Sequence, residues 1–153
     1  MVVAGPAGET DADPVTVRVR NVTTSGFEIR LQEYEYLAPG DHPAEAVSYL
    51  VVERGHYTLA SGATVEADTV TVGSSFAQVD FVTPFPQSPA LFTVVSSVND
   101  ADAVHVRVRS VSAASFEARL SEGELTEASH GPESVSYVAW SYGSDDGSSD
   151  AAA

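Results

Sequence analysis

The chain has 153 residues, of which 22 are acidic and seven are basic, so its formal net charge is −15. The length suits one or two compact domains, and the 43% hydrophobic fraction is typical of a chain with a packed core. Absence of cysteine excludes disulfides, thiolate metal sites and cysteine nucleophiles. The negative charge excludes nucleic acid as a direct partner, because phosphates require clustered positive charge. No apolar run approaches the roughly 20 residues needed to cross a bilayer, so we expect no membrane insertion.

All the basic residues are arginine, and lysine is absent. Dense carboxylates with no lysine and few large apolar residues are typical of extreme halophiles, because molar salt screens carboxylate repulsion to about 3 Å. We therefore expect a high-salt, haloarchaeal origin. The first five residues carry neither the positive region nor the apolar stretch of a secretory signal. The chain is then cytoplasmic, cut from a longer protein, or carried outside by another route such as virion assembly.

The predicted elements are all strands. Residues 15–20 and 27–31 alternate apolar and polar side chains, and the Thr23–Gly26 turn joins them as a β-hairpin. Further strands are expected, in chain order, at 46–53, 64–72, 76–82, 91–98, 104–109, 116–120 and 135–140. Prolines 84, 86 and 89 mark a loop or edge between two of them. No stretch has a capped apolar 3.6-residue period, so the fold class is all-β.

An internal repeat organises these strands. The segment from Pro14, PVTVRVRNVTTSGFEIRLQEYE, aligns with AVHVRVRSVSAASFEARLSEGE from Ala103, and HPAEAVSYLV from His42 aligns with HGPESVSYVA from His130. This similarity indicates a tandem duplication. We expect two tandem antiparallel β-sandwich units, at residues 1–72 and 73–143, followed by an acidic tail at 144–153.

The first unit is predicted to be incomplete. Residues 76–82 precede the second unit's strands, whereas no equivalent strand precedes the first unit's. The first unit therefore lacks its N-terminal edge strand, or a neighbouring subunit or the segment 63–72 supplies it. Because an unpaired strand edge invites strand addition, we expect oligomerisation.

The hairpin pattern and the stretch VSYLVVERGHYTLASGATVEA at residues 47–67 resemble the H-type lectin domain and its bacterial and viral relatives. The resemblance covers most of the chain. It implies a trimer-forming β-sandwich that binds glycans at subunit boundaries. The sequence departs from the family at a tryptophan of the final strand, where Tyr49 and Tyr137 stand instead.

Two sets of side chains are candidates for sites. Aromatic faces and polar groups suited to glycan or subunit contact are Tyr34, Tyr36, His42, His130, Trp140 and Tyr142. The alternative interpretation of Tyr34 and Tyr36 is packing on a neighbouring subunit. The cross-strand pattern also predicts two ladders of charged side chains, most simply structural salt-bridge networks: Arg18, Arg20, Glu28 and Arg30, repeated as Arg107, Arg109, Glu117 and Arg119.

Other chemistry finds little support in the sequence. Asp11, Asp13, Asp100 and Asp102 could contribute to a Ca²⁺ site, but two carboxylates per loop are too few, and turn formation is the simpler interpretation. His42 and His130 are repeat-equivalent, but one such histidine per unit, without a second histidine nearby, is weak support for zinc. No hydrolase, phosphate-loop, dinucleotide or zincin motif is present. We expect neither enzymatic activity nor a cofactor.

The functional prediction is a non-enzymatic virion surface protein of a haloarchaeal tailed virus: a fibre, spike, turret or capsid decoration. It would form a homotrimer, contact other virion proteins and bind glycans of the host surface. Two alternatives remain. One is a purely structural brace of the virion, and the other is an extracellular adhesin domain of a cellular haloarchaeon.

Overall fold

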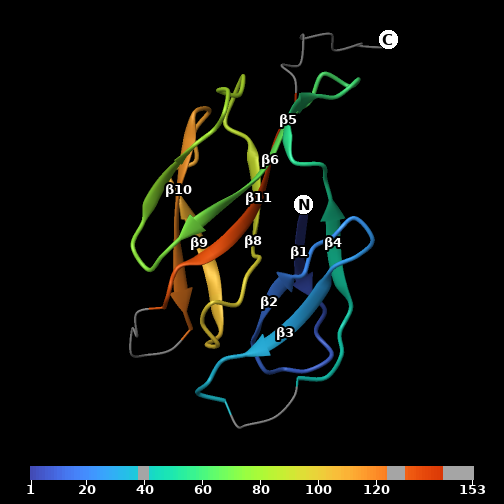
Figure 1. Ribbon diagram of the computed structural model, residues 1–153, viewed down its shortest axis with the longest axis vertical. Helices are drawn as coiled ribbons and strands as arrows, with labels where there is room; N and C mark the ends of the chain where they lie inside the picture. The colour runs from blue at the N-terminus through green and yellow to red at the C-terminus, as the bar shows by residue number, and fades with distance from the viewer. Residues whose placement is uncertain (38–41, 124–129, 143–153) are drawn as a thin grey trace, which may run out of the picture.

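The computed structural model describes residues 1–37, 42–123 and 130–142, and within these ranges the chain forms strands and no helix (Figure 1). The predicted all-β class is confirmed. The strands are β1 (Val2–Ala7), β2 (Val15–Arg20), β3 (Glu28–Glu33), β4 (Val47–Val51), β5 (Gly55–Thr58), β6 (Thr64–Val72), β7 (Ala77–Asp80), β8 (Ala90–Val95), β9 (Val104–Arg109), β10 (Ser115–Glu122) and β11 (Glu133–Ser141).

Each repeat contains the predicted hairpin. β2 pairs with β3, and β9 pairs with β10, both antiparallel. The turns match as well, because Thr23 N–H donates to the Gly26 carbonyl and Ser112 N–H donates to the Ser115 carbonyl. Each hairpin leaves its first strand through a residue with positive φ, Asn21 at 51° and Ser110 at 53°. Asparagine tolerates this left-handed conformation better than most residues, and the repeat preserves the conformation even where serine replaces it.

The second unit is a complete sandwich. One layer is the sheet β7-β10-β9, and the other is formed by β8, β11, β6 and β5. Aromatic and aliphatic side chains from both layers fill the space between them. Its buried core comprises Val72, Phe81, Phe85, Val95, Val104, Phe116, Ala118, Leu120, Val135, Tyr137 and Ala139.

The first unit has fewer strands. β1 pairs with β4 as a two-stranded sheet, and the β2–β3 hairpin lies beside it. A single parallel bridge between Arg18 and Val95 joins β2 to β8, which gives the six-stranded order β3-β2-β8-β11-β6-β5. A second core lies where the two units meet. It consists of Val2, Val3, Val19, Val65, Ala67, Val94 and Val138.

β6 distinguishes the two units. It runs antiparallel to β11 from Thr64↔Ser141 to Val72↔Glu133, and it carries the short strand β5 on its other edge. The segment 63–72 therefore completes the second unit and not the first, and the strands divide between the units after β4 rather than after residue 72. Within the described ranges, no strand takes the places of β6 and β7 beside β4 and β3.

The described residues contain no helix that is long and apolar enough to span a membrane. The predicted tail at 144–153 lies outside these residues.

Candidate functional site

Glu133, at the start of β11, organises the loop between β8 and β9. Its side chain is fully buried and accepts hydrogen bonds from the backbone N–H groups of Asn99 and Asp100, each at 2.9 Å, and from the Ser97 hydroxyl. Burial acts to raise the pKa of this carboxyl, but hydrogen bonds, first that of Ser97, outweigh it and leave the pKa lowered. Glu133 is therefore held as a carboxylate inside the protein.

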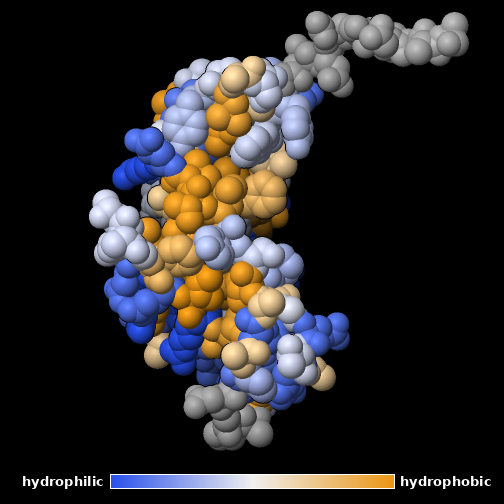
Figure 2. Space-filling model, turned by 90° about the vertical axis from the view of Figure 1, so that its right-hand side faces the viewer, coloured by the Kyte–Doolittle hydropathy of each residue, from blue (hydrophilic) through white to orange (hydrophobic). Residues whose placement is uncertain are grey.

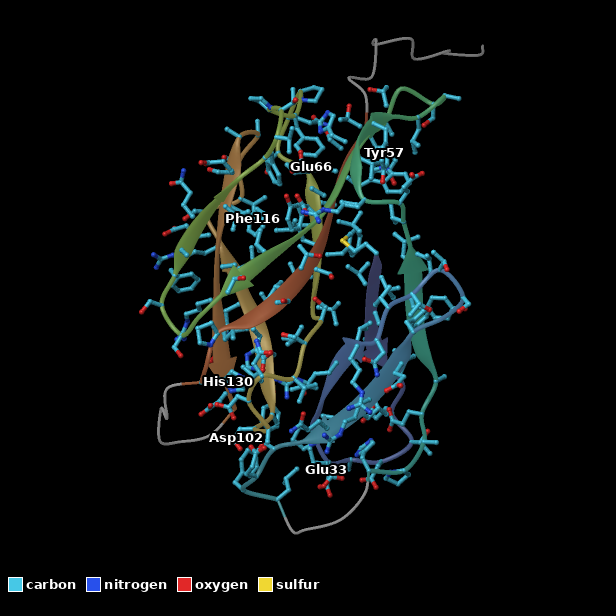
Figure 3. The ribbon with its side chains drawn as sticks, viewed as in Figure 1. Glu33, Tyr57, Glu66, Asp102, Phe116 and His130 are labelled. Atoms are coloured by element: carbon cyan, nitrogen blue, oxygen red, sulfur yellow. The ribbon has the colours of Figure 1, made fainter. Side chains whose placement is uncertain are left out.

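His130 links Glu133 to the end of the preceding hairpin. Its Nε2 lies 3.3 Å from Glu133, and its Nδ1 lies 3.1 Å from Glu122 at the end of β10. Figure 3 shows His130 and Asp102 at the same end of the second unit. This histidine thus ties together two strand ends and a loop.

The first unit contains the same arrangement. The buried His42 side chain lies 3.1 Å from Glu33 and 3.3 Å from Glu45, and Glu45 accepts the backbone N–H groups of Thr10 at 2.8 Å and Asp11 at 3.0 Å. Burial alone would lower the pKa of His42, but hydrogen bonds to the two carboxylates outweigh it and raise the pKa. Both predicted loop histidines therefore pair with buried carboxylates.

Arg18 connects the two units through this arrangement. Its side chain is only 1% exposed, and its Nη2 donates to Glu133 at 2.8 Å. Nη1 donates to the backbone carbonyls of Asp100 at 3.1 Å and Asp102 at 3.2 Å. Burial lowers the pKa of Arg18, and the attraction of Glu133 opposes that effect. The guanidinium from β2 of one unit is therefore enclosed by the loop and the carboxylate of the other.

Further contacts surround this arginine. Gln32 accepts from Arg18 at 3.2 Å and donates to the Ala101 carbonyl at 2.5 Å, and Ala103 N–H donates to Glu35 at 2.6 Å. The Tyr34 hydroxyl lies 3.0 Å from Nδ1 of His105. Its ring covers Gly123 so closely that any Cβ there would clash. We call this set, with Arg18 and Glu133, the junction.

Arg18 was expected in a ladder of charged side chains within its own hairpin, whereas the structure pairs it with Glu133 of the other unit. Both faces of β2 are covered, one by its own unit and the other by the 99–103 loop of the second unit. Its repeat equivalent, Arg107, is exposed. Within the described residues, the first hairpin is docked against a loop of the other unit, whereas Arg107 of the second hairpin is exposed, so the two repeats use the same residue differently.

The remaining ladder residues lie on the paired strands of each hairpin, as predicted, with Arg20 opposite Glu28 and Arg109 opposite Glu117. Arg20 pairs with Glu28 at 2.6 Å and Arg109 pairs with Glu117 at 3.0 Å, and both pairs are exposed. The Arg109 guanidinium also lies 3.9 Å from the centre of the Phe76 ring, and that of Arg119 lies 5.3 Å from it. Arg30 is exposed. Exposed pairs of this kind add little stability, typically below about 1 kcal/mol each.

The candidate aromatic residues occupy two separate places. Tyr34 and Tyr36 stack with ring centres 5.8 Å apart beside the junction, where Tyr36 is 57% exposed. Trp140 and Tyr142 lie at the opposite end of β11, where Trp140 packs on the core between the units and Tyr142 is 73% exposed. The structure therefore does not bring the four rings into a single site.

The aspartate pairs form turns. Asp11 accepts the N–H of Asp13 at 3.1 Å, and Asp100 accepts the N–H of Asp102 at 3.3 Å. In residues 1–37, 42–123 and 130–142, no group of three or more histidine and carboxylate side chains is arranged to hold a metal ion.

Glu66 is a further buried carboxylate that was not predicted from the sequence. Glu66 of β6 accepts the Tyr137 hydroxyl at 2.7 Å and the Val82 N–H at 2.9 Å, and it lies 3.1 Å from His56. Burial and this carboxylate raise the pKa of Tyr137. Figure 3 places Glu66 and Phe116 within the second unit. Sequence alternation could not identify Glu66, because it indicates the face of a strand that a side chain occupies but not what covers that face.

The first unit is open where the second is filled. A groove of about 540 Å³ lies between β3 and β4. Its lining comprises Ile29, Arg30, Leu31, His42, Pro43, Ala44, Glu45, Val47 and Tyr49. Tyr49 is 60% exposed here, whereas its repeat equivalent Tyr137 is 2% exposed.

The fold and the junction together show an all-β protein of two unequal units that the buried ion pair Arg18–Glu133 connects. The chain is similar to part of the protein Halomucin of Haloquadratum walsbyi (strain DSM 16790 / HBSQ001), with 33% identity over 151 residues. The match covers 91% of this chain and 2% of that protein, so the chain spans only a small part of its relative's length. The relative is haloarchaeal, which supports the high-salt origin predicted from composition. No protein-family model and no solved structure matches the chain.

Proposed function

We propose that the chain is a structural, non-catalytic module of a haloarchaeal extracellular or cell-surface protein. Its role is to hold two sandwich units in a fixed orientation in concentrated salt. The observation that carries this proposal is the junction, because a buried arginine with four acceptors in the opposite unit or its own hairpin restrains the units far more than a flexible linker does. Similarity to part of Halomucin supports the extracellular location.

Small-angle X-ray scattering at about 3 M salt tests the structural role. The native chain should give one compact particle whose radius of gyration does not change with temperature below unfolding. Arg18→Ala should broaden the distribution of inter-unit distances, whereas the matched variant Arg107→Ala should not. Equal scattering profiles for Arg18→Ala and the native chain would remove the basis for a fixed orientation.

The predicted virion location shares this structural role and differs only in where the protein resides. A protein of the particle surface would share the acidic exterior and the structural role. Mass spectrometry distinguishes the two locations, because the chain should be found either in purified virions or in material released from intact haloarchaeal cells by protease.

Glycan contact is a second candidate function, and the exposure of Tyr36 and Tyr142 favours it. Such rings offer flat apolar faces to a sugar. Titration with glycans from a haloarchaeal surface should then show binding that Tyr36→Ala or Tyr142→Ala weakens. Light scattering on the same samples tests the trimer, which we retain as part of this candidate. Unaltered binding in both variants would place any glycan site elsewhere.

A further inference from the structure

The tandem repeat provides an internal reference for the open groove of the first unit. The groove residues Ile29, Leu31, Val47 and Tyr49 are equivalent to Ala118, Leu120, Val135 and Tyr137, all of which belong to the buried core of the second unit. What covers them there is the segment β6–β7 with the following Phe81 and Phe85. In the first unit the same positions are partly or largely open to solvent. Figure 2 shows apolar surface exposed along this side of the molecule.

The groove already has the geometry of the filled site. The rings of Phe27 and Tyr49 meet edge to face, with centres 5.0 Å apart and an interplanar angle of 68°. Their equivalents, Phe116 and Tyr137, are 5.2 Å apart at the same angle. In the second unit, Phe81 completes this pair, at 5.5 Å from Phe116 and 6.3 Å from Tyr137. Among the described residues, the first unit therefore holds two rings of a three-ring cluster in position without the third.

The backbone edges are open as well. β11 pairs with β6 along its length, and β10 pairs with β7 over four residues. Among the described residues, β4 pairs only with β1, and β3 pairs only with β2. Each thus presents an edge to which a further strand can hydrogen-bond.

We propose that this groove is a docking site for a β6–β7-type segment supplied by a further repeat of the same kind. The segment places one strand antiparallel to β4, turns, and places a second strand along β3. It inserts an aromatic side chain, equivalent to Phe81, against Phe27 and Tyr49. A carboxylate at the position of Glu66 accepts the Tyr49 hydroxyl, as Glu66 accepts that of Tyr137. This inference deepens the proposed structural function, on which it rests.

Stoichiometry argues against a second copy of this chain as the donor. Within residues 1–37, 42–123 and 130–142, each copy has two units but one β6–β7 segment, and that segment already lies in the second unit. Copies that exchange the segment would open one groove for each that they fill. Edge-to-edge pairing of β4 between two copies would leave β3 and the Phe27–Tyr49 pair uncovered. A segment from a further repeat would pair with the edge of β4, pair with the edge of β3 and cover the Phe27–Tyr49 ring pair.

A peptide in trans tests the proposal. We would titrate the full chain with a fluorescently labelled synthetic peptide of residues 62–86 at about 3 M salt and follow fluorescence anisotropy. Saturable one-to-one binding is expected. Tyr49→Ala should weaken it by about tenfold or more, because it removes the ring on which the peptide's Phe81 packs. Tyr36→Ala, which changes an exposed ring outside the groove, should leave the affinity unchanged. A peptide with Phe81→Ala should also bind at least about tenfold more weakly.

Hydrogen exchange identifies where the peptide binds. Bound peptide should slow exchange at amides of β4 and β3 and leave the rest of the chain unaltered. Absence of binding, or binding that Tyr49→Ala does not weaken, would overturn the proposal. The proposal would also be overturned if light scattering showed a dimer without peptide and hydrogen exchange showed protected β4 amides in that dimer. A second copy would then occupy the groove. None of these outcomes alters the scattering test with Arg18→Ala, so failure of the docking site and failure of the structural role are distinguishable.

Discussion

Arg18→Ala should strongly destabilise the protein. The substitution removes four hydrogen bonds to groups of the second unit and to Gln32, and it leaves Glu133 buried without its cationic partner. Removal of one partner of a buried ion pair costs about 3–5 kcal/mol. We expect the lower end, because Glu133 keeps hydrogen bonds from Asn99, Asp100 and Ser97. A loss of about 3 kcal/mol is a large fraction of the roughly 5–15 kcal/mol typical of folded domains.

Urea unfolding at about 3 M salt, followed by circular dichroism, measures this loss. Arg107→Ala is the matched control, since it deletes the same side chain at the equivalent but exposed position of the second repeat. Exposed substitutions of this kind change stability by about 0.5 kcal/mol or less. The double variant Arg18→Met with Glu133→Gln should recover part of the loss, because no unpaired charge stays buried. Equal effects of Arg18→Ala and Arg107→Ala would refute the assignment of Arg18 as the connection between the units.

Three further predictions concern pH, a buried hydroxyl and salt. Because the pKa of His42 is raised above 6.5 in the folded state, its contribution to stability is complete below pH 6.5 and is lost as pH rises through the folded pKa; His42→Gln should flatten this dependence in thermal unfolding. Tyr137→Phe leaves a buried Glu66 oxygen unpaired and should cost about 1–3 kcal/mol in urea unfolding, whereas Tyr49→Phe should cost almost nothing. Dilution from about 3 M to 0.1 M salt should lower the melting temperature, because the carboxylates are then unscreened, and an unchanged value would contradict the halophilic interpretation.

Local pattern is sufficient to predict most of the strands. Alternation in residues 15–20 and 104–109 identifies β2 and β9, and the repeat alignment makes them equivalent from the sequence alone. β5 was not predicted, because its sequence, GHYT, is too short to show a period. β6 was predicted at its observed bounds, but its partner could not be, since strand pairing depends on residues far along the chain.

The junction shows why the role of Arg18 could not be predicted. Alternation indicates which face of a strand a side chain occupies, but it does not indicate what covers that face. The arginine itself is identical in both repeats. A usable signal existed only in its neighbours, because Gln32 and Tyr34 of the first hairpin correspond to Ser121 and Gly123 of the second. These two differing residues, Gln32 and Tyr34, both contact the other unit.

The contacts between the two units run from the first unit to the second. The first unit sends Arg18 into the loop of the second, and the segment that follows the first unit supplies the strands that complete the second. Arg18, β6 and β7, which complete the second unit, therefore all lie before β8 in the chain. The first unit carries the same receiving features: the buried carboxylate Glu45, whose Oε2 has no hydrogen-bond partner among the described residues, and the open edges of β3 and β4. An arginine and a strand pair supplied by the proposed further repeat would fill these positions and extend the same geometry by one more unit.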